Sequence, residues 1–257
     1  MVAERAAAAG WRVVAVGHGP FDVTSPASVA AVFEEARPSA VVHTVGVLGN
    51  SASGSPGRNW AVNAVGAAVV ARAAAAHGAR LVHVSSDAVH SGRPEPYTEA
   101  DDPSPVFPYG AAKAAAEVAV AAVAPDAAIV RTSLLVSGGV RPLSKYERFA
   151  LALARGEAAG VLFTDDVRCP VAVDDVAAAL VELAGSDFAG VLNVAGPQPL
   201  TRYDLGVLVA RRHGVDPSRL PAGTIAATGL TRPGCLRLDC TLAGRVLGTV
   251  PGPVTGR

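Results

Sequence analysis

The chain has 257 residues, of which 50% are hydrophobic and 17% are charged, and its formal net charge is zero. This balance indicates a globular protein with one large domain, and it gives no basic surface for nucleic acid or anionic membrane. The three cysteines, at 169, 235 and 240, have no CxxC spacing, so we expect neither a metal site nor a disulfide framework. No apolar run is long enough to span a membrane, and a reducing cytoplasm is the expected compartment.

The N-terminal half alternates helical patterns with short β-branched runs. In order, we expect a helix over 1–9, a strand over 11–16, a helix over 26–36, a strand over 40–45, a helix over 59–77 and a strand over 80–86. The dipeptide Ser25-Pro26 marks the start of the second helix, because serine caps and proline opens helices. A Gly/Ser loop over 46–57 separates the second strand from the long helix. Such alternation predicts an α/β fold with a parallel sheet and helices on both faces.

The second half continues this alternation, which becomes less regular after residue 134. A loop rich in proline and aspartate over 87–108 leads into a helix that begins near Tyr109. The elements expected after it are a strand over 128–132, a helix over 146–155, a strand over 161–164, a helix over 173–183, a strand over 191–195 and a helix over 203–213. We interpret the chain as a single domain whose smaller lobe is built mainly from about residues 134–257.

Tyr109 and Lys113 are the strongest candidates for chemistry. They lie four residues apart in an expected helix, so their side chains share one face. An ammonium beside a phenol favours the ionised phenol, so Lys113 is expected to lower the pKa of Tyr109. Ser86 and Asp87 end an expected parallel strand, which is where open α/β sheets place their sites. The sequence therefore predicts a tuned proton donor close to a strand-end site.

These residues resemble the extended short-chain dehydrogenase/reductases, and among them the dTDP-4-dehydrorhamnose reductase group. The resemblance rests on Ser85–Gly92, Pro96–Glu99, Pro103 and Tyr109–Lys113. Further similar residues occur at Asp22–Thr24, Arg37-Pro38, Asn63–Gly66, Val130–Ser133, Val173–Ala177 and Arg232-Pro233. The resemblance implies a Rossmann-type doubly wound parallel sheet with a small C-terminal substrate-binding lobe.

The same resemblance implies an NAD(P)H-dependent reductase of a nucleotide-activated 4-keto-6-deoxy sugar. Tyr109 would give its proton to the C4 carbonyl oxygen as hydride arrives from the nicotinamide, and Ser86 would hydrogen-bond that oxygen. Lys113 would also hold the nicotinamide ribose. The implied cofactor-binding residues are Asp22, Val23, Val45, Gly46, Asn63, Tyr109 and Lys113. The implied substrate-binding residues are Ser86, Asp87, Ala88, Arg168 and Arg232.

The chain also departs from that family. Its members begin with a strand and a G-x-x-G-x-x-G turn that holds the cofactor pyrophosphate, and this sequence has neither. We expect either about two dozen further residues upstream of Met1 or a truncated chain with impaired cofactor binding. Residues 16–19 contain no acid for a ribose 2′-hydroxyl, which favours NADP while leaving NAD open. Leu134 stands where these reductases often carry an aromatic residue, so the sequence does not fix the sugar.

Two other functions fit the same fold. One is a non-catalytic NAD(P)- or sugar-nucleotide-binding regulatory protein, similar to the regulatory subunit of methionine adenosyltransferase. The missing glycine turn favours it, whereas Ser86, Tyr109 and Lys113 count against it. The other is an NAD-dependent epimerase or dehydratase. It is disfavoured because Ala88 stands where sugar 4,6-dehydratases usually carry an acidic residue.

Several polar residues fit a structural role better than a chemical one. His43 and His83 lie within apolar strands, and we interpret them as core or rim histidines. The acidic pairs Asp165-Asp166 and Asp174-Asp175 are not accompanied by a set of His and Cys ligands, so no metal site is expected there. The expected partner is a small sugar nucleotide, without nucleic acid or membrane, and the sequence leaves a homodimer open.

Overall fold

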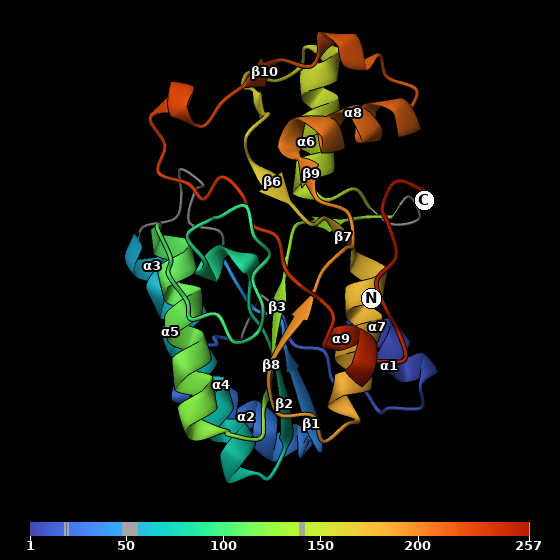
Figure 1. Cartoon of the computed structure of the whole chain (residues 1–257). Helices are drawn as coiled ribbons and strands as arrows, with labels where there is room; N and C mark the ends of the chain where they lie inside the picture. The colour runs from blue at the N-terminus through green and yellow to red at the C-terminus, as the bar shows by residue number, and fades with distance from the viewer. Residues whose placement is uncertain (18, 20, 48–55, 139–141, 257) are drawn as a thin grey trace.

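A four-stranded parallel sheet forms the centre of the chain in the computed structural model, which describes residues 1–17, 19, 21–47, 56–138 and 142–256 (Figure 1). The strand order is β1-β2-β3-β8. The strands are β1 (Ala40–His43), β2 (Arg80–Val84), β3 (Ala128–Thr132) and β8 (Gly190–Val194). Each neighbouring pair runs parallel, which confirms the predicted α/β fold class.

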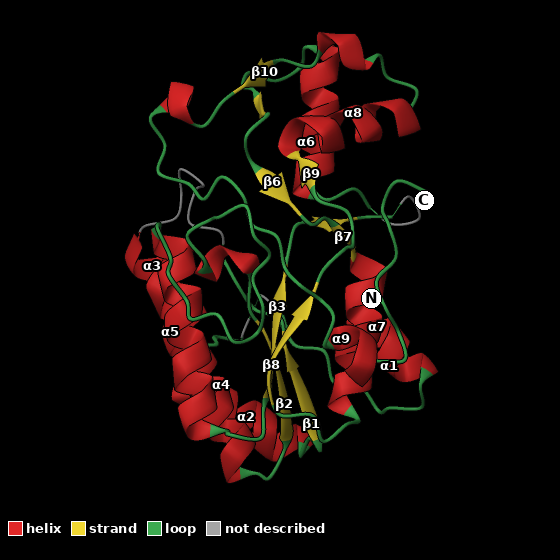
Figure 2. Cartoon of the chain, viewed as in Figure 1, coloured by secondary structure: helices red, strands yellow, loops and turns green. Residues whose placement is uncertain are grey.

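Helices cover both faces of this sheet (Figures 1 and 2). One face carries α2 (Pro26–Ala36), α4 (Gly66–Ala76) and α5 (Pro108–Val123). The other carries α1 (Val2–Ala8), α7 (Val173–Ala184) and α9 (Ala243–Val246). Ser25 begins α2 as the sequence predicted, since its hydroxyl accepts a hydrogen bond from the Ser28 amide at 3.3 Å.

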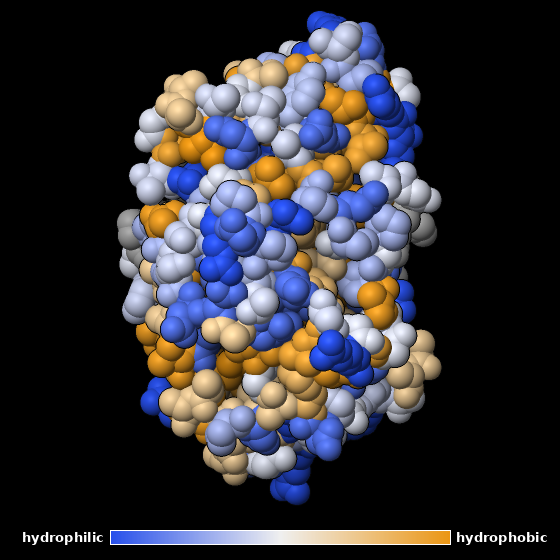
Figure 3. Space-filling view, in the orientation of Figure 1, coloured by the Kyte–Doolittle hydropathy of each residue, from blue (hydrophilic) through white to orange (hydrophobic). Residues whose placement is uncertain are grey.

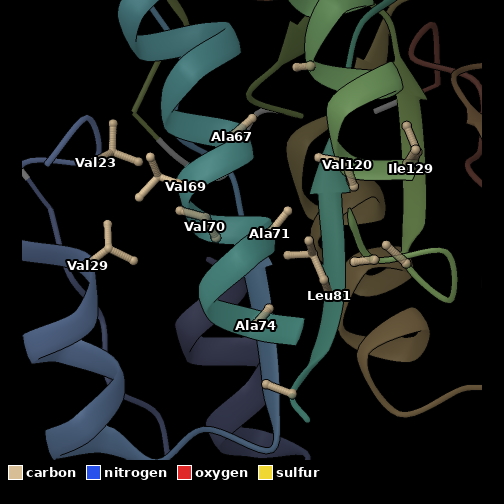
Figure 4. Close-up of a cluster of buried hydrophobic side chains, with 14 of the residues drawn as sticks. Val23, Val29, Ala67, Val69, Val70, Ala71, Ala74, Leu81, Val120 and Ile129 are labelled. Carbon is tan, nitrogen blue, oxygen red and sulfur yellow. The ribbon is translucent and has the colours of Figure 1, made fainter. Parts of the chain in front are cut away.

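Alternation along the strands divides the core into two layers. Leu81 and Ile129 pack against α2, α4 and α5, whereas Val82 and Val130 pack against α7. This follows from the two-residue period of a strand, which sends successive side chains to opposite faces. Figure 4 shows α4 in the middle of the first layer, with valines facing α2 and small alanines facing the sheet. Each fully buried Leu, Ile or Val contributes about 1.5–3 kcal/mol.

The long helix predicted over 59–77 is interrupted in the structure by a π-helical turn. It consists of α3 (Pro56–Trp60), the π-helix η1 (Ala61–Val65) and α4. Such turns are rare and often lie at functional sites. The turn contains Asn63, one of the residues implied in cofactor binding. Most of the Gly/Ser loop predicted over 46–57 lies outside the described residues.

The strand predicted over 11–16 is wrong. Residues 11–17 adopt no regular structure, and the side chains of Val14 and Val16 are 52% and 46% exposed. A β-branched run becomes a strand only where another strand satisfies its backbone groups. In the described sheet β1 is an edge strand, and residues 11–17 do not pair with it. Instead, the Arg12 guanidinium donates a hydrogen bond to the Ala36 carbonyl at 2.9 Å.

A smaller lobe lies beyond the carboxyl ends of the strands (Figure 1). It contains α6 (Lys145–Arg155), α8 (Arg202–Arg212), β5 (Leu162–Phe163), β10 (Ala222–Gly223) and the short helices η3 (Pro217–Arg219) and η4 (Ala226–Thr228). A separate apolar cluster, which includes Leu151 and Leu205, joins α6 to α8. The lobe is thus drawn from residues after 134, although α7, β8 and α9 of that range lie with the sheet.

Two short strand pairs connect the lobe to the sheet. They are β4 (Leu135–Val136) with β7 (Val171–Ala172), and β6 (Val167–Arg168) with β9 (Leu200–Thr201). On the face in Figure 3, hydrophilic and hydrophobic residues are interspersed. Among the described residues, no helix combines the length and hydropathy needed to cross a membrane.

Candidate active site

The polar residues at the end of β2 form a fixed hydrogen-bonded group below the lobe. Ser86 caps the short helix η2 (Asp87–Val89), because its hydroxyl accepts from the Ala88 amide at 3.2 Å. The Asp87 carboxylate, 5% exposed, accepts from the Ser86 hydroxyl at 3.1 Å and from the Ser133 hydroxyl at 2.6 Å. Ser133 follows β3, so two adjacent strand ends hold one carboxylate in place.

Tyr109 lies in the first turn of α5, beside this group. Burial raises the pKa of Tyr109 to about 12, a hydrogen bond with the Ser86 side chain opposes that rise, and the charge of Asp87 adds to it. The phenol therefore keeps its proton at neutral pH, as a proton donor must. The structure brings Ser86 and Tyr109 together, as the sequence predicted.

A glycine at position 110 allows this approach. A Cβ atom on Gly110 would lie 2.1 Å from the Ala88 carbonyl oxygen, far closer than van der Waals contact. Only glycine therefore lets the start of α5 pack directly on η2. Because Tyr109 precedes Gly110, the same contact sets the distance between the phenol and Ser86.

Lys113 lies one turn after Tyr109 and is 3% exposed. Its Nζ donates a hydrogen bond to the Val84 carbonyl oxygen at 2.6 Å. Burial lowers the pKa of Lys113 to about 8, and the nearby Glu117 carboxylate raises it. The predicted lowering of the Tyr109 pKa is wrong for this structure: burial raises that pKa, and Ser86 rather than Lys113 supplies the opposing contribution. An ammonium has three N–H donors, so Lys113 keeps donors for a ribose hydroxyl.

The residues implied in cofactor binding have defined structural contacts. Asn63 clamps the loop after β1, since its side chain accepts from the Val47 amide at 3.0 Å and donates to the Val47 carbonyl at 2.9 Å. Gly46 lies under this clamp, because a Cβ there would be 3.2 Å from the Asn63 oxygen. Val45 packs against the core. The clamp fixes the backbone at the carboxyl end of β1.

Two further residues of that set lie before α2. Val23 is buried and packs so closely on Gly66 that a Cβ at Gly66 would be 2.9 Å from it. Asp22 is exposed and accepts hydrogen bonds from the amide and hydroxyl of Thr24 at 2.9 and 2.8 Å. These bonds lower the pKa of Asp22. Both residues are ordered by local contacts and lie beyond the amino end of α2.

Three arginines surround one buried carboxylate where the lobe meets the sheet. Asp166 is fully buried, with Arg168 Nη1 at 2.7 Å, Arg232 Nη2 at 2.8 Å and Arg202 Nε at 3.5 Å. Arg168 also reaches the strand end, with its Nε 3.9 Å from Asp87 Oδ2. The structure therefore connects Arg168 and Arg232, both implied in substrate binding, through Asp166. Sequence reasoning missed the roles of Asp166 and Arg202, although an acidic pair without metal-binding neighbours needs nearby cations.

A second buried ion pair lies one turn beyond Lys113. Arg131 Nη2 is 2.8 Å from Glu117 Oε2, and Arg131 Nε donates to both Glu117 oxygens at 3.1 and 3.2 Å. The Ser85 hydroxyl donates to Glu117 Oε1 at 2.5 Å. Glu117 was also missed, yet Tyr109, Lys113 and Glu117 recur every four residues on one helix face.

His43 and His83 form a neutral pair on the strands below Lys113. Their Nδ1 atoms lie 3.0 Å apart. Burial, followed by the charge of Lys113, lowers the pKa of His43 to about 3 and that of His83 well below its usual value. Both are buried, so the interpretation of these residues as core histidines is confirmed.

Comparison with known proteins places these features in a family context. The family described as the RmlD substrate binding domain matches residues 1–254. A dTDP-4-dehydrorhamnose reductase from Mycolicibacterium smegmatis is 33% identical over 229 residues, which is 87% of this chain and 69% of that protein. Methionine adenosyltransferase 2 subunit beta from Rattus norvegicus is 31% identical over 186 residues, which is 67% of this chain and 54% of that protein.

Solved structures share the fold. The crystal structure of dTDP-4-dehydrorhamnose reductase from Bacillus anthracis in complex with NADP matches with a TM-score of 0.87 at 22% identity. The match covers 99% of this chain and 90% of that one. At this level of identity the likeness establishes the arrangement of sheet, helices and lobe.

Proposed function

We propose, starting from the fact that this chain belongs to the RmlD substrate binding domain family, that it is an NAD(P)H-dependent reductase of a nucleotide-activated 4-keto-6-deoxy sugar. The observation that carries this proposal is the group of Ser86, Tyr109 and Lys113 at the carboxyl end of β2, beneath the lobe. The relative that is 33% identical is a reductase of such a sugar nucleotide.

The reaction needs a proton for the carbonyl oxygen, and Tyr109 is placed to give it. When bound, a reduced nicotinamide supplies the hydride for the sugar carbon. Tyr109 holds its proton, because its pKa is raised to about 12, until negative charge develops on the carbonyl oxygen. Ser86 hydrogen-bonds the phenol and can donate to the same oxygen.

The nicotinamide half of NADP fits the residues present. Lys113 keeps N–H donors for the ribose hydroxyls, and the loop clamped by Asn63 offers Val45 and Gly46 as a fixed wall. Asp22 and Val23 are the proposed contacts at the adenine end. NADP is preferred to NAD because residues 16–19 contain no acid, and the Bacillus anthracis reductase is in complex with NADP.

The arginine cluster around Asp166 fits an anionic substrate. Three guanidinium groups exceed the combined charge of Asp166 and Asp87 by one, and the buried Nε of Arg232 has no acceptor among the described residues. We assign Arg168 and Arg232, with Asp87 and Ala88, to the substrate. A diphosphate is the part of a sugar nucleotide that such a cluster would bind.

Oxidation of NADPH in the presence of a dTDP-4-keto-6-deoxyhexose tests the proposal. The wild-type protein is expected to oxidise the cofactor only when the keto-sugar is present, and Tyr109→Phe is expected to lose this activity. Tyr203→Phe, in α8, is the matched control and is expected to retain it. If wild type and Tyr109→Phe are equally inert while both are folded, the enzyme proposal is wrong.

A second candidate is a non-catalytic protein that binds NAD(P) or a sugar nucleotide and regulates a partner. The similarity to methionine adenosyltransferase 2 subunit beta favours it. It predicts that NADPH or the sugar nucleotide binds without turnover. An epimerase or dehydratase would convert the sugar without net NADPH oxidation, and Ala88 counts against it.

Location and assembly belong to the same proposal. A sugar-nucleotide reductase with three free cysteines fits the cytoplasm, where thiols stay reduced. Cell fractionation with an antibody against the chain tests this location. A homodimer is the assembly that we would look for first, by light scattering of the purified protein.

A further inference from the structure

The buried pair Glu117–Arg131 lies next to Lys113, and the proton transfer proposed above does not use it. Glu117 follows Lys113 by one helical turn, and both side chains are buried, so they share the inward face of α5. Ser85, which follows β2, and Arg131 on β3 hold the Glu117 carboxylate through four contacts between 2.5 and 3.2 Å. These contacts fix the position of the Glu117 carboxylate.

The surroundings of Lys113 give this carboxylate a direct effect. Among the described residues, the ionisable side chains that interact electrostatically with Lys113 are Glu117 on α5, His43 on β1 and His83 on β2, and Tyr109 lies one turn before it on α5. The two histidines are neutral, and Tyr109 is protonated. On the far side of the ion pair, His90 lies 3.5 Å from Arg131, and its pKa is lowered to about 4. Glu117 is therefore the negative charge that offsets the burial of Lys113.

We propose that Glu117 is a positioning residue that keeps the Lys113 ammonium charged and directed at the strand end, with Arg131 and Ser85 holding Glu117 in place. The ammonium donates to the Val84 carbonyl at 2.6 Å. Val84 ends β2 and Ser85 follows it, so the partners of Lys113 and Glu117 are consecutive residues at this strand end. The two side chains of α5 are therefore both held at the end of this strand.

The proposal gives opposite roles to the two members of the ion pair. Removing the negative charge of Glu117 lowers the pKa of Lys113, because the buried ammonium loses its counter-charge. Removing the positive charge of Arg131 does not lower that pKa, because the remaining carboxylate then acts on Lys113 alone. Damage to packing would act in the same direction in both cases. The catalytic meaning of the proposal rests on the reductase function above, whereas the charge of Lys113 can be measured without it.

NMR titration of lysine labelled with ¹³C at Cε measures that charge directly. The chain has only two lysines, Lys113 and the exposed Lys145, so Lys145 is an internal reference and Lys145→Arg assigns the two signals. The variants are Glu117→Gln, Arg131→Met and the double variant that carries both. The double variant removes both charges together, which avoids leaving one buried charge unpaired. Glu157→Gln, at an exposed site, is the control.

We expect Lys113 to titrate near pH 8 in the wild type. In Glu117→Gln and in the double variant the midpoint is expected to fall by about one unit or more, from the Coulomb energy of a buried pair whose Cβ atoms are about 6 Å apart. In Arg131→Met it is expected to stay or rise, and in Glu157→Gln to stay. A midpoint unchanged in the double variant would overturn the proposal, and so would an equal fall in Glu117→Gln and Arg131→Met.

A second measurement connects this charge to turnover. The alkaline limb of the pH profile of kcat/KM for NADPH oxidation is expected to move to lower pH in the double variant, by the same amount as the NMR midpoint. A uniform loss at every pH, with no movement of the limb, would contradict a positioning role. If the protein does not reduce the keto-sugar, the reductase function fails, and the NMR titration still decides whether Glu117 controls Lys113.

Discussion

Replacing Gly110 by alanine tests whether close packing of α5 on η2 sets the position of Tyr109. The new Cβ would lie 2.1 Å from the Ala88 carbonyl oxygen, whereas Cβ atoms do not approach other atoms closer than 3.0 Å. The two segments must therefore separate by about 0.9 Å. Overpacking of this kind costs about 1–3 kcal/mol, and the better helix propensity of alanine returns at most about 1 kcal/mol. Stability should fall only modestly.

Activity should fall much further than stability. Tyr109 precedes the substituted residue, so it moves away from Ser86, and a misplacement of about 1 Å costs about 100-fold in rate. The measurements are kcat for NADPH oxidation and the thermal midpoint of unfolding. Gly244→Ala in α9 is the control, because a Cβ there meets no atom within 4 Å. A Gly110→Ala protein with unchanged kcat would refute the reasoning, since the contact would then not position the phenol.

Three further substitutions have expected outcomes. Tyr109→Phe should lower kcat by about 10²- to 10⁴-fold, the range for losing a general acid, without moving the unfolding midpoint, and a small change in kcat would exclude Tyr109 as the donor. Lys113→Met should stabilise the protein at pH 7 by up to about 3 kcal/mol, because burial lowers the lysine pKa from 10.5 to about 8. As pH rises from about 8 to 10.5, the unfolded wild-type chain binds more protons than the folded one, so the wild type gains stability. The difference in free energy of unfolding between Lys113→Met and the wild type, measured in urea, should therefore shrink over this window. A difference that does not change with pH would contradict a lowered lysine pKa. Asp166→Asn should cost about 3–5 kcal/mol in urea unfolding, because three arginines lose their buried counter-charge, and a cost below about 1 kcal/mol would mean that the cluster is solvated.

Local patterns predicted the elements that organise the site. The Ser25-Pro26 signal gave the start of α2, and strand–helix alternation gave the parallel sheet. The four-residue spacing gave the shared face of Tyr109 and Lys113. These features depend on neighbouring residues in the chain, so periodicity and capping were sufficient to find them. The family resemblance carried by the same motifs is confirmed by the match over residues 1–254.

Features that depend on distant partners could not be read from those patterns. Residues 11–16 have the composition of a strand, but a strand also needs a neighbour, and β1 does not provide one in the described sheet. The pKa of Tyr109 depends on how deeply α5 packs, so burial outweighed the lysine that the spacing indicated. Asp166 and its arginines come from three separate segments. The four-residue spacing could have indicated that Glu117 shares a helix face with Lys113. Its partner Arg131 lies on β3, so the ion pair could not be predicted from spacing.

Deuteride transfer is the most direct test of the central claim, which is reduction of a sugar C4 carbonyl with Tyr109 as the proton donor. The protein would be incubated in ordinary water with a dTDP-4-keto-6-deoxyhexose and NADPH deuterated at the transferred position, and the product examined by NMR. We predict one deuterium at C4 of the product from the wild-type protein, and formation of the same labelled product about 10²- to 10⁴-fold more slowly by Tyr109→Phe. Product without deuterium at C4, or equal rates of labelling by the two proteins, would contradict the claim.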